Sequence, residues 1–212
     1  PDGVFLHTGV VEDGVATTGG EVVLEPDRRR RLATARNHTT THILHKALRT
    51  VLGEHVSQAG SDVSPERLRF DFTHFSAMTP EEKEAVEAIV NEEICADDPV
   101  STKVMTIDEA KASGAMALFD EKYGEKVRVV SVGDFSRELC GGTHLGSTSG
   151  ACLFRIISES AVAAGVRRIE GVTGEEAVRF DTEHNALLKS VTETLKTNTS
   201  ELAKKADTVM NQ

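Results

Sequence analysis

Two short motifs that lie far apart in the chain constrain its fold most strongly. His38-Thr39-Thr40-Thr41-His42 falls in a segment with helical apolar spacing, and side chains four residues apart share one helix face. Cys140-Gly141-Gly142-Thr143-His144 offers a thiolate and an imidazole from a loop that two glycines allow to bend. Three imidazole nitrogens and one thiolate sulfur form a tetrahedral set that suits zinc. The sequence therefore predicts a zinc site, which joins a helix to a distant loop, with the ligands His38, His42, Cys140 and His144.

The spacing alone leaves the role of this site open. A structural zinc ion that staples the fold is as compatible with it as a catalytic one, and the histidines could also be core residues bonded to backbone carbonyls. Four protein ligands fill a tetrahedron, whereas catalytic zinc usually keeps a position for water. The motif of a metalloprotease is excluded, because three threonines separate His38 from His42 and the Glu general base of HExxH is missing.

Strand and helix patterns intermingle along the chain and predict an α+β fold, a mixed sheet layered with helices that carries the zinc site. Residues 1–30 hold short extended segments broken by glycines, as in part of a small β-barrel, and four arginines close them. We expect residues 31–172 to form the zinc-binding core. Residues 173–212 are expected to form a C-terminal connector helix that begins with a capping box of Thr173 and Glu176. Within the core, the patterns predict helices at 35–52, 79–95 and 107–117 and strands at 68–73, 100–105, 127–130, 151–157 and 166–172.

The composition is that of an ordinary globular protein, with 212 residues, 39% of them hydrophobic, and a net charge of −10. No apolar run approaches the roughly 20 residues that cross a bilayer, and the start of the chain does not resemble a signal peptide. Three cysteines disfavour a disulfide framework and indicate a reducing compartment. We therefore expect a cytoplasmic protein with no membrane partner. Because the first residue is Pro1 rather than Met, we also expect a fragment of a longer chain.

The negative charge is concentrated in two segments. Residues 81–98 hold eight acidic residues and one lysine, and residues 173–212 hold seven acidic and five basic residues. The remainder, which includes the metal motifs, is close to neutral. A strongly acidic surface repels nucleic acid. This distribution therefore predicts that the acidic helix points away from any bound RNA, and it does not exclude RNA as a partner.

Several blocks of the sequence resemble the editing domain of alanyl-tRNA synthetases of the bacterial type. Two of them contain the metal motifs, namely RNHTTTHILHKAL at 36–48 and ELCGGTH at 138–144. The others follow in the order of the family and are SQAGS at 57–61, RLRFDF at 67–72, GAMALF at 114–119 and GVRRIE at 165–170. Free-standing relatives and the editing domain of threonyl-tRNA synthetases share the two metal half-motifs, so the longer blocks favour the full synthetase. The sequence departs from the family at Asp120, where glycine is usual, and at 149–154.

This resemblance implies hydrolytic proofreading. A synthetase that activates alanine cannot strongly reject glycine or serine, because small apolar pockets discriminate poorly against one methyl or one hydroxyl group, and a second hydrolytic site solves the problem. In the family this domain cleaves the ester that joins Ser or Gly to tRNA(Ala). The implied partners are the acceptor end of tRNA(Ala) and the remaining domains of the synthetase. The resemblance also implies that the four metal residues hold zinc and that Thr41 and Gln58 line the amino-acid pocket.

Two alternatives remain open, a free-standing trans-editing deacylase and a non-catalytic tRNA-binding module stapled by zinc. Thr41 and Gln58 favour a hydrolase, because a structural staple does not need pocket residues. The aminoacylation site and any nucleotide-binding motif are absent from this stretch. We therefore expect ATP binding and alanine activation in other parts of the full-length ligase.

Further side chains have two interpretations each. His45 completes a histidine stripe and is expected to support the ligands, because the four-ligand set is already full. His74 is expected to make a backbone contact, and Cys95 and Cys152 to be small buried hydrophobes. The four consecutive arginines at 28–31 could meet phosphate or form a solvated turn. Four strand arginines could contact tRNA, with structural salt bridges as an equal alternative, and these are Arg69, Arg155, Arg167 and Arg168.

Overall fold

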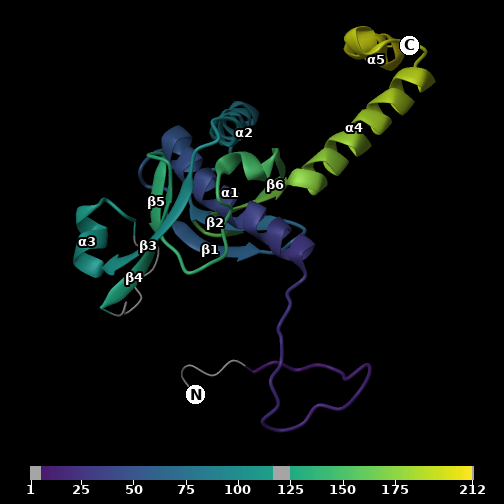
Figure 1. Cartoon of the computed structure of the whole chain (residues 1–212). Helices are drawn as coiled ribbons and strands as arrows, with labels where there is room; N and C mark the ends of the chain where they lie inside the picture. Colours follow the sequence, from purple (N-terminus) through teal and green to yellow (C-terminus); the bar gives the residue numbers. More distant parts are fainter. Residues whose placement is uncertain (1–5, 117–124, 212) are drawn as a thin grey trace.

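The computed structural model describes residues 6–116 and 125–211 (Figure 1). Helices and strands intermingle along the chain, as predicted for an α+β fold. No described helix is long and apolar enough to cross a membrane. The helices are α1 (Arg28–Leu52), α2 (Pro80–Cys95), α3 (Ile107–Ala112), α4 (Gly174–Thr194) and α5 (Leu202–Met210), with 3₁₀ turns η1 (Thr148–Ala151) and η2 (Thr199–Glu201). The strands are β1 (Gln58–Val63), β2 (Leu68–Thr73), β3 (Val100–Thr106), β4 (Lys126–Val132), β5 (Ser136–Leu139), β6 (Phe154–Ala163) and β7 (Val166–Thr173).

Helix α1 carries the first metal motif into the core. It begins at Arg28, earlier than the predicted start near residue 35, because the Asp27 carboxylate accepts a hydrogen bond from the Arg30 backbone N–H (2.9 Å) and caps the helix. The arginines at 28–31 therefore form its first turn and do not close an extended segment. The helix ends before Gly53, whose φ of 115° is a conformation that glycine adopts without strain.

Helices α1 and α2 pack with a four-stranded antiparallel sheet of order β1-β2-β7-β6. The predicted alternation in β2 is confirmed, since Leu68, Phe70 and Phe72 are fully buried. Helix α2 starts as predicted, with Thr79 and Glu82 forming a capping box and Pro80 in the first turn. This core buries the middle of α1 and thereby holds its histidines in place.

Strands β3, β4 and β5 form a separate antiparallel sheet, with α3 packed on it. The prediction of one mixed sheet is therefore wrong, because both sheets are antiparallel and each has its own apolar cluster. In Figure 1 this smaller sheet lies to one side of α1, and β5 runs closest to the helix. The loop that follows β5 carries the second metal motif.

Residues 6–27 form no strand, so the part of a β-barrel predicted at 1–30 does not form within this described segment. Val10 and Val23 are 90% and 94% exposed. The segment is too short to bury its own apolar side chains, and an isolated pair of strands is marginal in water. The predicted extended segment at 4–6 lies partly outside the described residues.

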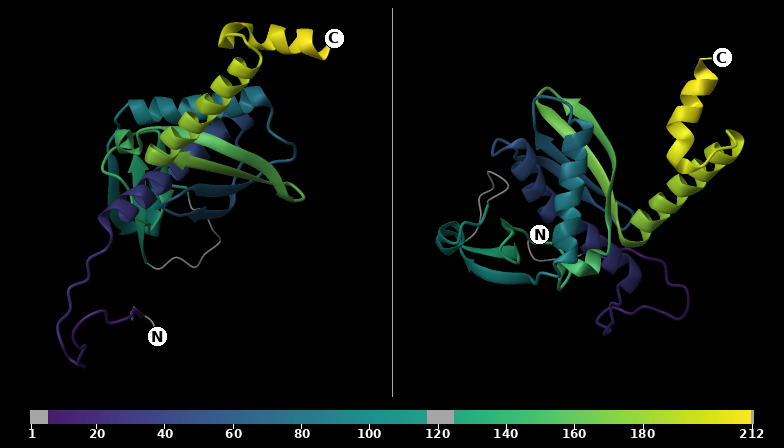
Figure 2. Two further views of the ribbon diagram at one scale, coloured as in Figure 1. Left: turned by 90° about the vertical axis from the view of Figure 1, so that its right-hand side faces the viewer. Right: turned by 90° about the horizontal axis from the view of Figure 1, so that it is seen from above.

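The C-terminal segment 173–212 is also not one continuous helix. Helix α4 ends at Thr194, Lys196 has a φ of 50°, and η2 and α5 follow. The predicted capping box at Thr173 is wrong, because the Thr173 hydroxyl donates to the Asn37 side-chain oxygen (2.7 Å). Figure 2 shows α4 leaving the sheet as an arm that carries α5 away from the core. The predicted role as a connector stays a prediction.

Candidate metal centre

The structure brings the two metal motifs together. The ligand atoms of His38 and His42, from α1, and of Cys140 and His144, from the loop after β5, all lie within 4.8 Å of one another. The Cys140 Sγ atom is 3.4 Å from His38 Nε2 and 3.3 Å from His144 Nε2. Three imidazoles and one thiol thus converge on a space that a single ion could fill.

The loop that carries Cys140 and His144 is fixed by contacts on several sides. From β4, the Arg128 guanidinium donates to the carbonyl oxygens of Cys140 (3.0 Å) and Gly142 (2.6 Å). From α1, the Thr39 hydroxyl accepts from the Leu145 N–H (3.0 Å) and lies 3.3 Å from His144 Nδ1. These bonds hold the loop against β4 and α1, so the separation of the two motifs is set by the packing of the smaller sheet beside this helix.

A buried carboxylate lies behind the metal residues. Glu138 is 1% exposed, and its two oxygens accept hydrogen bonds from His42 Nδ1 (2.5 Å) and His45 Nδ1 (2.9 Å). Sequence reasoning missed Glu138. The signal was its position in β5 two residues before Cys140, because alternate residues of a strand point to the same side. His45 contacts this carboxylate, as expected of a residue that supports the ligands.

The charges of the centre are coupled. Burial raises the pKa of the Cys140 thiol, but hydrogen bonds with His144 and His38 and the nearby His42 ring outweigh it and bring the pKa down to about 3. Burial also raises the pKa of Glu138, but attraction to His42 and bonds from His42 and His45 lower it to about 2. Burial opposes the charge of His42, yet Glu138 and Cys140 raise its pKa to about 10. The thiolate and the carboxylate are therefore the stable forms near neutral pH.

This arrangement fits a soft divalent metal ion. His42 Nε2 is buried and has no hydrogen-bond partner in the described part of the chain, although Nδ1 of the same ring is bonded to Glu138. The Gly142 backbone N–H donates to Cys140 Sγ (3.4 Å), which also favours a thiolate. A buried imidazole nitrogen without a partner costs free energy unless an ion or water occupies the site. Thiolate and imidazole together are the donors that zinc prefers.

The pocket role of Thr41 and Gln58 stays a prediction, because the described hydrogen bonds of both side chains are with residues outside the four metal residues. The Thr41 hydroxyl is buried in α1 and donates to the Asn37 carbonyl one turn earlier (2.8 Å). The Gln58 side chain, at the start of β1, donates to the Ser61 hydroxyl (3.1 Å). Both elements flank the same core as the metal residues.

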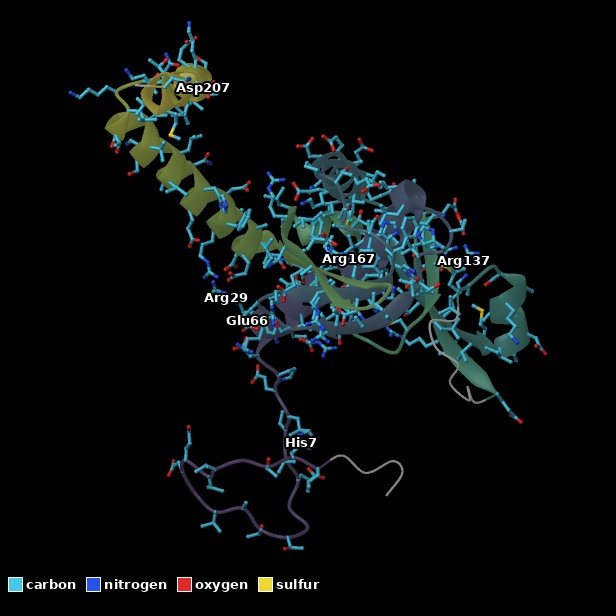
Figure 3. The ribbon with its side chains drawn as sticks, turned by 180° about the vertical axis from the view of Figure 1, so that it is seen from behind. His7, Arg29, Glu66, Arg137, Arg167 and Asp207 are labelled. Carbon is cyan, nitrogen blue, oxygen red and sulfur yellow. The ribbon has the colours of Figure 1, made fainter. Side chains whose placement is uncertain are left out.

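The four strand arginines predicted to contact tRNA each lie beside a carboxylate. Arg168 forms a two-pronged pair with Asp71 (2.7 and 2.8 Å), and Arg69 lies 3.8 Å from the same side chain. Arg167, which is labelled in Figure 3, pairs with Glu159 (2.5 Å). Arg155 binds both Glu87 and Asp181. The alternative of structural salt bridges is therefore realised in all four, and contact with tRNA stays a prediction.

Two further expectations, those for the two cysteines and for His74, differ from the structure. Cys95 and Cys152 are exposed, so neither is a buried hydrophobe. The ring of His74 contacts side chains instead of backbone, with its Nδ1 2.8 Å from His55 Nε2. Arg29, at the start of α1 in Figure 3, pairs with Glu175 of α4, and Arg30 pairs with Glu66. Two of the four consecutive arginines therefore bind carboxylates of the same chain.

The chain is similar in sequence to a known domain family and to curated proteins. Residues 127–170, which include Cys140 and His144, match the family described as the threonyl and alanyl tRNA synthetase second additional domain. The chain is 57% identical over 211 residues to an alanine–tRNA ligase of Acetivibrio thermocellus, a match that covers 100% of this chain and 24% of that protein. It is 53% identical over 207 residues to the corresponding enzyme of Geobacillus kaustophilus, covering 98% of this chain and 23% of the relative. The chain thus spans about a quarter of the length of the relatives that it matches.

Proposed function

Because the chain corresponds over its full length to one segment of the alanine–tRNA ligases, we propose that it is their proofreading domain. In this proposal it hydrolyses the ester that joins Ser or Gly to tRNA(Ala), at a zinc site formed by the two metal motifs. The observation that carries the proposal is the convergence of four metal-ligating atoms within 4.8 Å from segments far apart in the chain.

The reaction class follows from the limits of recognition by size. An alanine pocket cannot exclude glycine by steric clash, and it excludes serine weakly, so correction after charging needs a second site. Hydrolysis adds water across the ester, breaks the bond between the acyl carbon and the ribose oxygen, and returns a proton to the tRNA hydroxyl. A site that hydrogen-bonds the seryl hydroxyl rejects alanine, because alanine leaves that polar group unpaired.

The residues of this chain have separate roles in the proposal. His38, His42, Cys140 and His144 would hold the ion. Bound zinc would supply a positive charge that polarises the ester carbonyl, activates water or orients the α-amino group. Thr41 and Gln58 would line the amino-acid pocket and provide the polar partners for serine. No Ser/His/Asp triad is assigned, and no side chain is proposed as a general base.

The partners in this proposal are the acceptor end of tRNA(Ala) and the other domains of the ligase. The Acetivibrio relative is named an alanine–tRNA ligase, and three quarters of its length lie outside the match. We propose that ATP binding and alanine activation belong to that remainder, and that the whole protein works in the cytoplasm during translation. Arg69 has the longest ion pair of the four strand arginines and is the first candidate for contact with tRNA phosphate.

A zinc-stapled tRNA-binding module is the second candidate. It is favoured by one observation, namely that four protein ligand atoms converge, which is the number that fills the tetrahedral coordination of structural zinc sites. A free-standing deacylase shares the proposed chemistry and differs only in acting without the rest of the ligase. Activity and metal content measured together separate the hydrolase from the zinc-stapled module.

The test is deacylation of Ser-tRNA(Ala) by this chain, with zinc content measured on the same samples. We expect hydrolysis by the unaltered chain, loss of both zinc and hydrolysis in Cys140→Ala, and no change in Cys152→Ala, which removes an exposed thiol elsewhere. Zinc retained without hydrolysis above background would establish the staple. Hydrolysis that survives loss of Cys140 and of the metal would disprove the zinc mechanism.

A further inference from the structure

The buried carboxylate of Glu138 connects two histidines of one helix to strand β5. We propose that Glu138 is a positioning residue of the metal centre, which holds His42 with Nε2 directed at the ion, and that His45 anchors Glu138 in turn. This inference rests on the proposed zinc site. It concerns two residues outside the four-ligand set.

The two nitrogens of the His42 ring have different surroundings. Nδ1 is bonded to Glu138 Oε2 (2.5 Å), whereas Nε2 is buried and lacks a partner in the described part of the chain. His42 is one of the four residues whose ligand atoms converge. A carboxylate can only accept, so Nδ1 keeps its hydrogen, and Nε2 is the nitrogen that can release a proton and bind a cation. The bond therefore sets both the tautomer and the rotation of the ring.

The carboxylate is itself oriented. Its second oxygen, Oε1, accepts from His45 Nδ1 (2.9 Å) and from the Ser136 hydroxyl (3.4 Å). His42 and His45 are three residues apart on α1, so both rings present Nδ1 to the same side of the helix. One carboxylate thus binds two rings, with one oxygen for each, and cannot rotate without breaking both bonds.

Because the Glu138 carboxylate is buried, loss of either of its hydrogen bonds would cost free energy. Glu138 and His45 are 1% and 2% exposed, and a buried carboxylate is tolerated only when its oxygens are bonded. The negative charge behind His42 also strengthens the ring as a donor toward a cation. Glu138 acts through His42 because both of its oxygens are committed to imidazole N–H groups.

Glu138→Gln is the informative substitution, because it keeps the shape and removes one acceptor. The amide oxygen can accept from only one ring, so the NH₂ group then faces the other Nδ1–H. If His42 changes tautomer, its Nε2 carries the hydrogen and cannot bind metal. If His45 changes tautomer, its Nε2–H becomes a buried donor among apolar side chains such as Phe70, whose ring centroid lies 5.2 Å away.

The experiment measures zinc affinity by competition with a chelator, and the absorption spectrum of the Co²⁺-substituted protein. We expect Glu138→Gln to weaken zinc binding by about 10- to 100-fold, the range for loss of such a partner, and to alter the Co²⁺ spectrum. Glu138→Asp keeps the charge but is too short to reach both rings, so we expect a smaller loss. Glu159→Gln is the matched control, since it removes another buried carboxylate that pairs with Arg167, and we expect affinity within twofold of the unaltered chain.

Thermal unfolding of the zinc-free variants shows whether each one folds, and Glu138→Asp carries the test if Glu138→Gln does not. Zinc affinity and a Co²⁺ spectrum unchanged in folded Glu138 variants would overturn the inference while leaving the zinc site intact. An unaltered chain that binds no zinc would instead overturn the proposed site itself. Failure of this inference therefore appears in the Glu138 variants, whereas failure of the proposed zinc site appears in the unaltered chain.

Discussion

Gly142 lies against the His38 ring so closely that a Cβ atom at this position would be 1.9 Å from His38 Cε1. The second glycine of the loop is thus required by a ligand on the opposite element. Its neighbour Gly141 has no atom within 4 Å of such a Cβ. The two glycines look equivalent in the sequence, and in the structure only Gly142 has this close contact with His38.

We therefore expect Gly142→Ala to displace His38 or the loop and to weaken zinc binding at least tenfold. Gly141→Ala is the control and should retain nearly full affinity. Zinc titration of both variants against a chelator provides the measurement. Equal affinities in the two variants would contradict the contact.

The Cys140 thiol should react as a thiolate in zinc-free protein. Burial raises its pKa but the surrounding histidines lower it to about 3, so the thiolate fraction hardly changes between pH 5 and pH 8. We expect an alkylation rate at Cys140 that is nearly independent of pH over this range, whereas an ordinary free thiol reacts faster as the pH approaches about 8.5. Mass spectrometry of alkylated peptides measures this rate. Added zinc should protect the residue, and a rate that rises tenfold per pH unit would refute the prediction.

The two-pronged pair between Asp71 of β2 and Arg168 of β7 should stabilise the central strands in a pH-dependent way. The bonds from Arg168 outweigh burial and hold the pKa of Asp71 below its ordinary value. A depressed pKa in the folded state gives stability that is present above the unfolded value of about 3.9 and is lost as the pH falls through the folded value. We expect Asp71→Asn to lower the melting temperature by about 2–4 °C at pH 7. The difference should shrink below pH 4, and a difference that grows under acid would contradict this assignment.

Arg155 should fix the base of the C-terminal arm. It binds Asp181 of α4 through two bonds (2.8 and 2.9 Å) and Glu87 of α2 (3.0 Å). We expect Arg155→Met to increase hydrogen exchange in the first turns of α4 several-fold. Arg179→Met removes an exposed pair within α4 and is the control, with exchange expected to stay unchanged. Equal protection of α4 from hydrogen exchange in both variants would show that the ion pairs of Arg155 do not fix this helix.

The acidic helix α2 should face away from bound tRNA. Glu84 and Glu92 are exposed on it, so Glu84→Gln with Glu92→Gln should change the affinity for tRNA(Ala) by less than twofold. Arg69→Gln tests the opposite surface and should weaken binding and reduce its salt dependence. Affinity measured at two salt concentrations checks both. A clear gain in affinity from the glutamine pair would place α2 at the RNA.

Local patterns were sufficient for several elements of the core, but they missed β1 and β5. The residue patterns predicted a strand at 68–73 and a helix that starts at residue 79, because apolar period and helix capping depend on neighbours in the sequence. The local patterns missed the helix cap at Asp27, so the start of α1 was predicted too late. They also predicted strands within residues 6–27, where the segment has no neighbouring strand to pair with.

The sequence by itself determined the chemistry of the candidate site, since the donor types of His38, His42, Cys140 and His144 and their spacing are local properties. Only the tertiary structure decided that these donors converge within 4.8 Å, that both sheets are antiparallel, and that Glu138 lies behind His42. The physical reason is that the position of β5 against α1 depends on packing between residues roughly a hundred positions apart. Periodicity along the chain carries no information about such contacts.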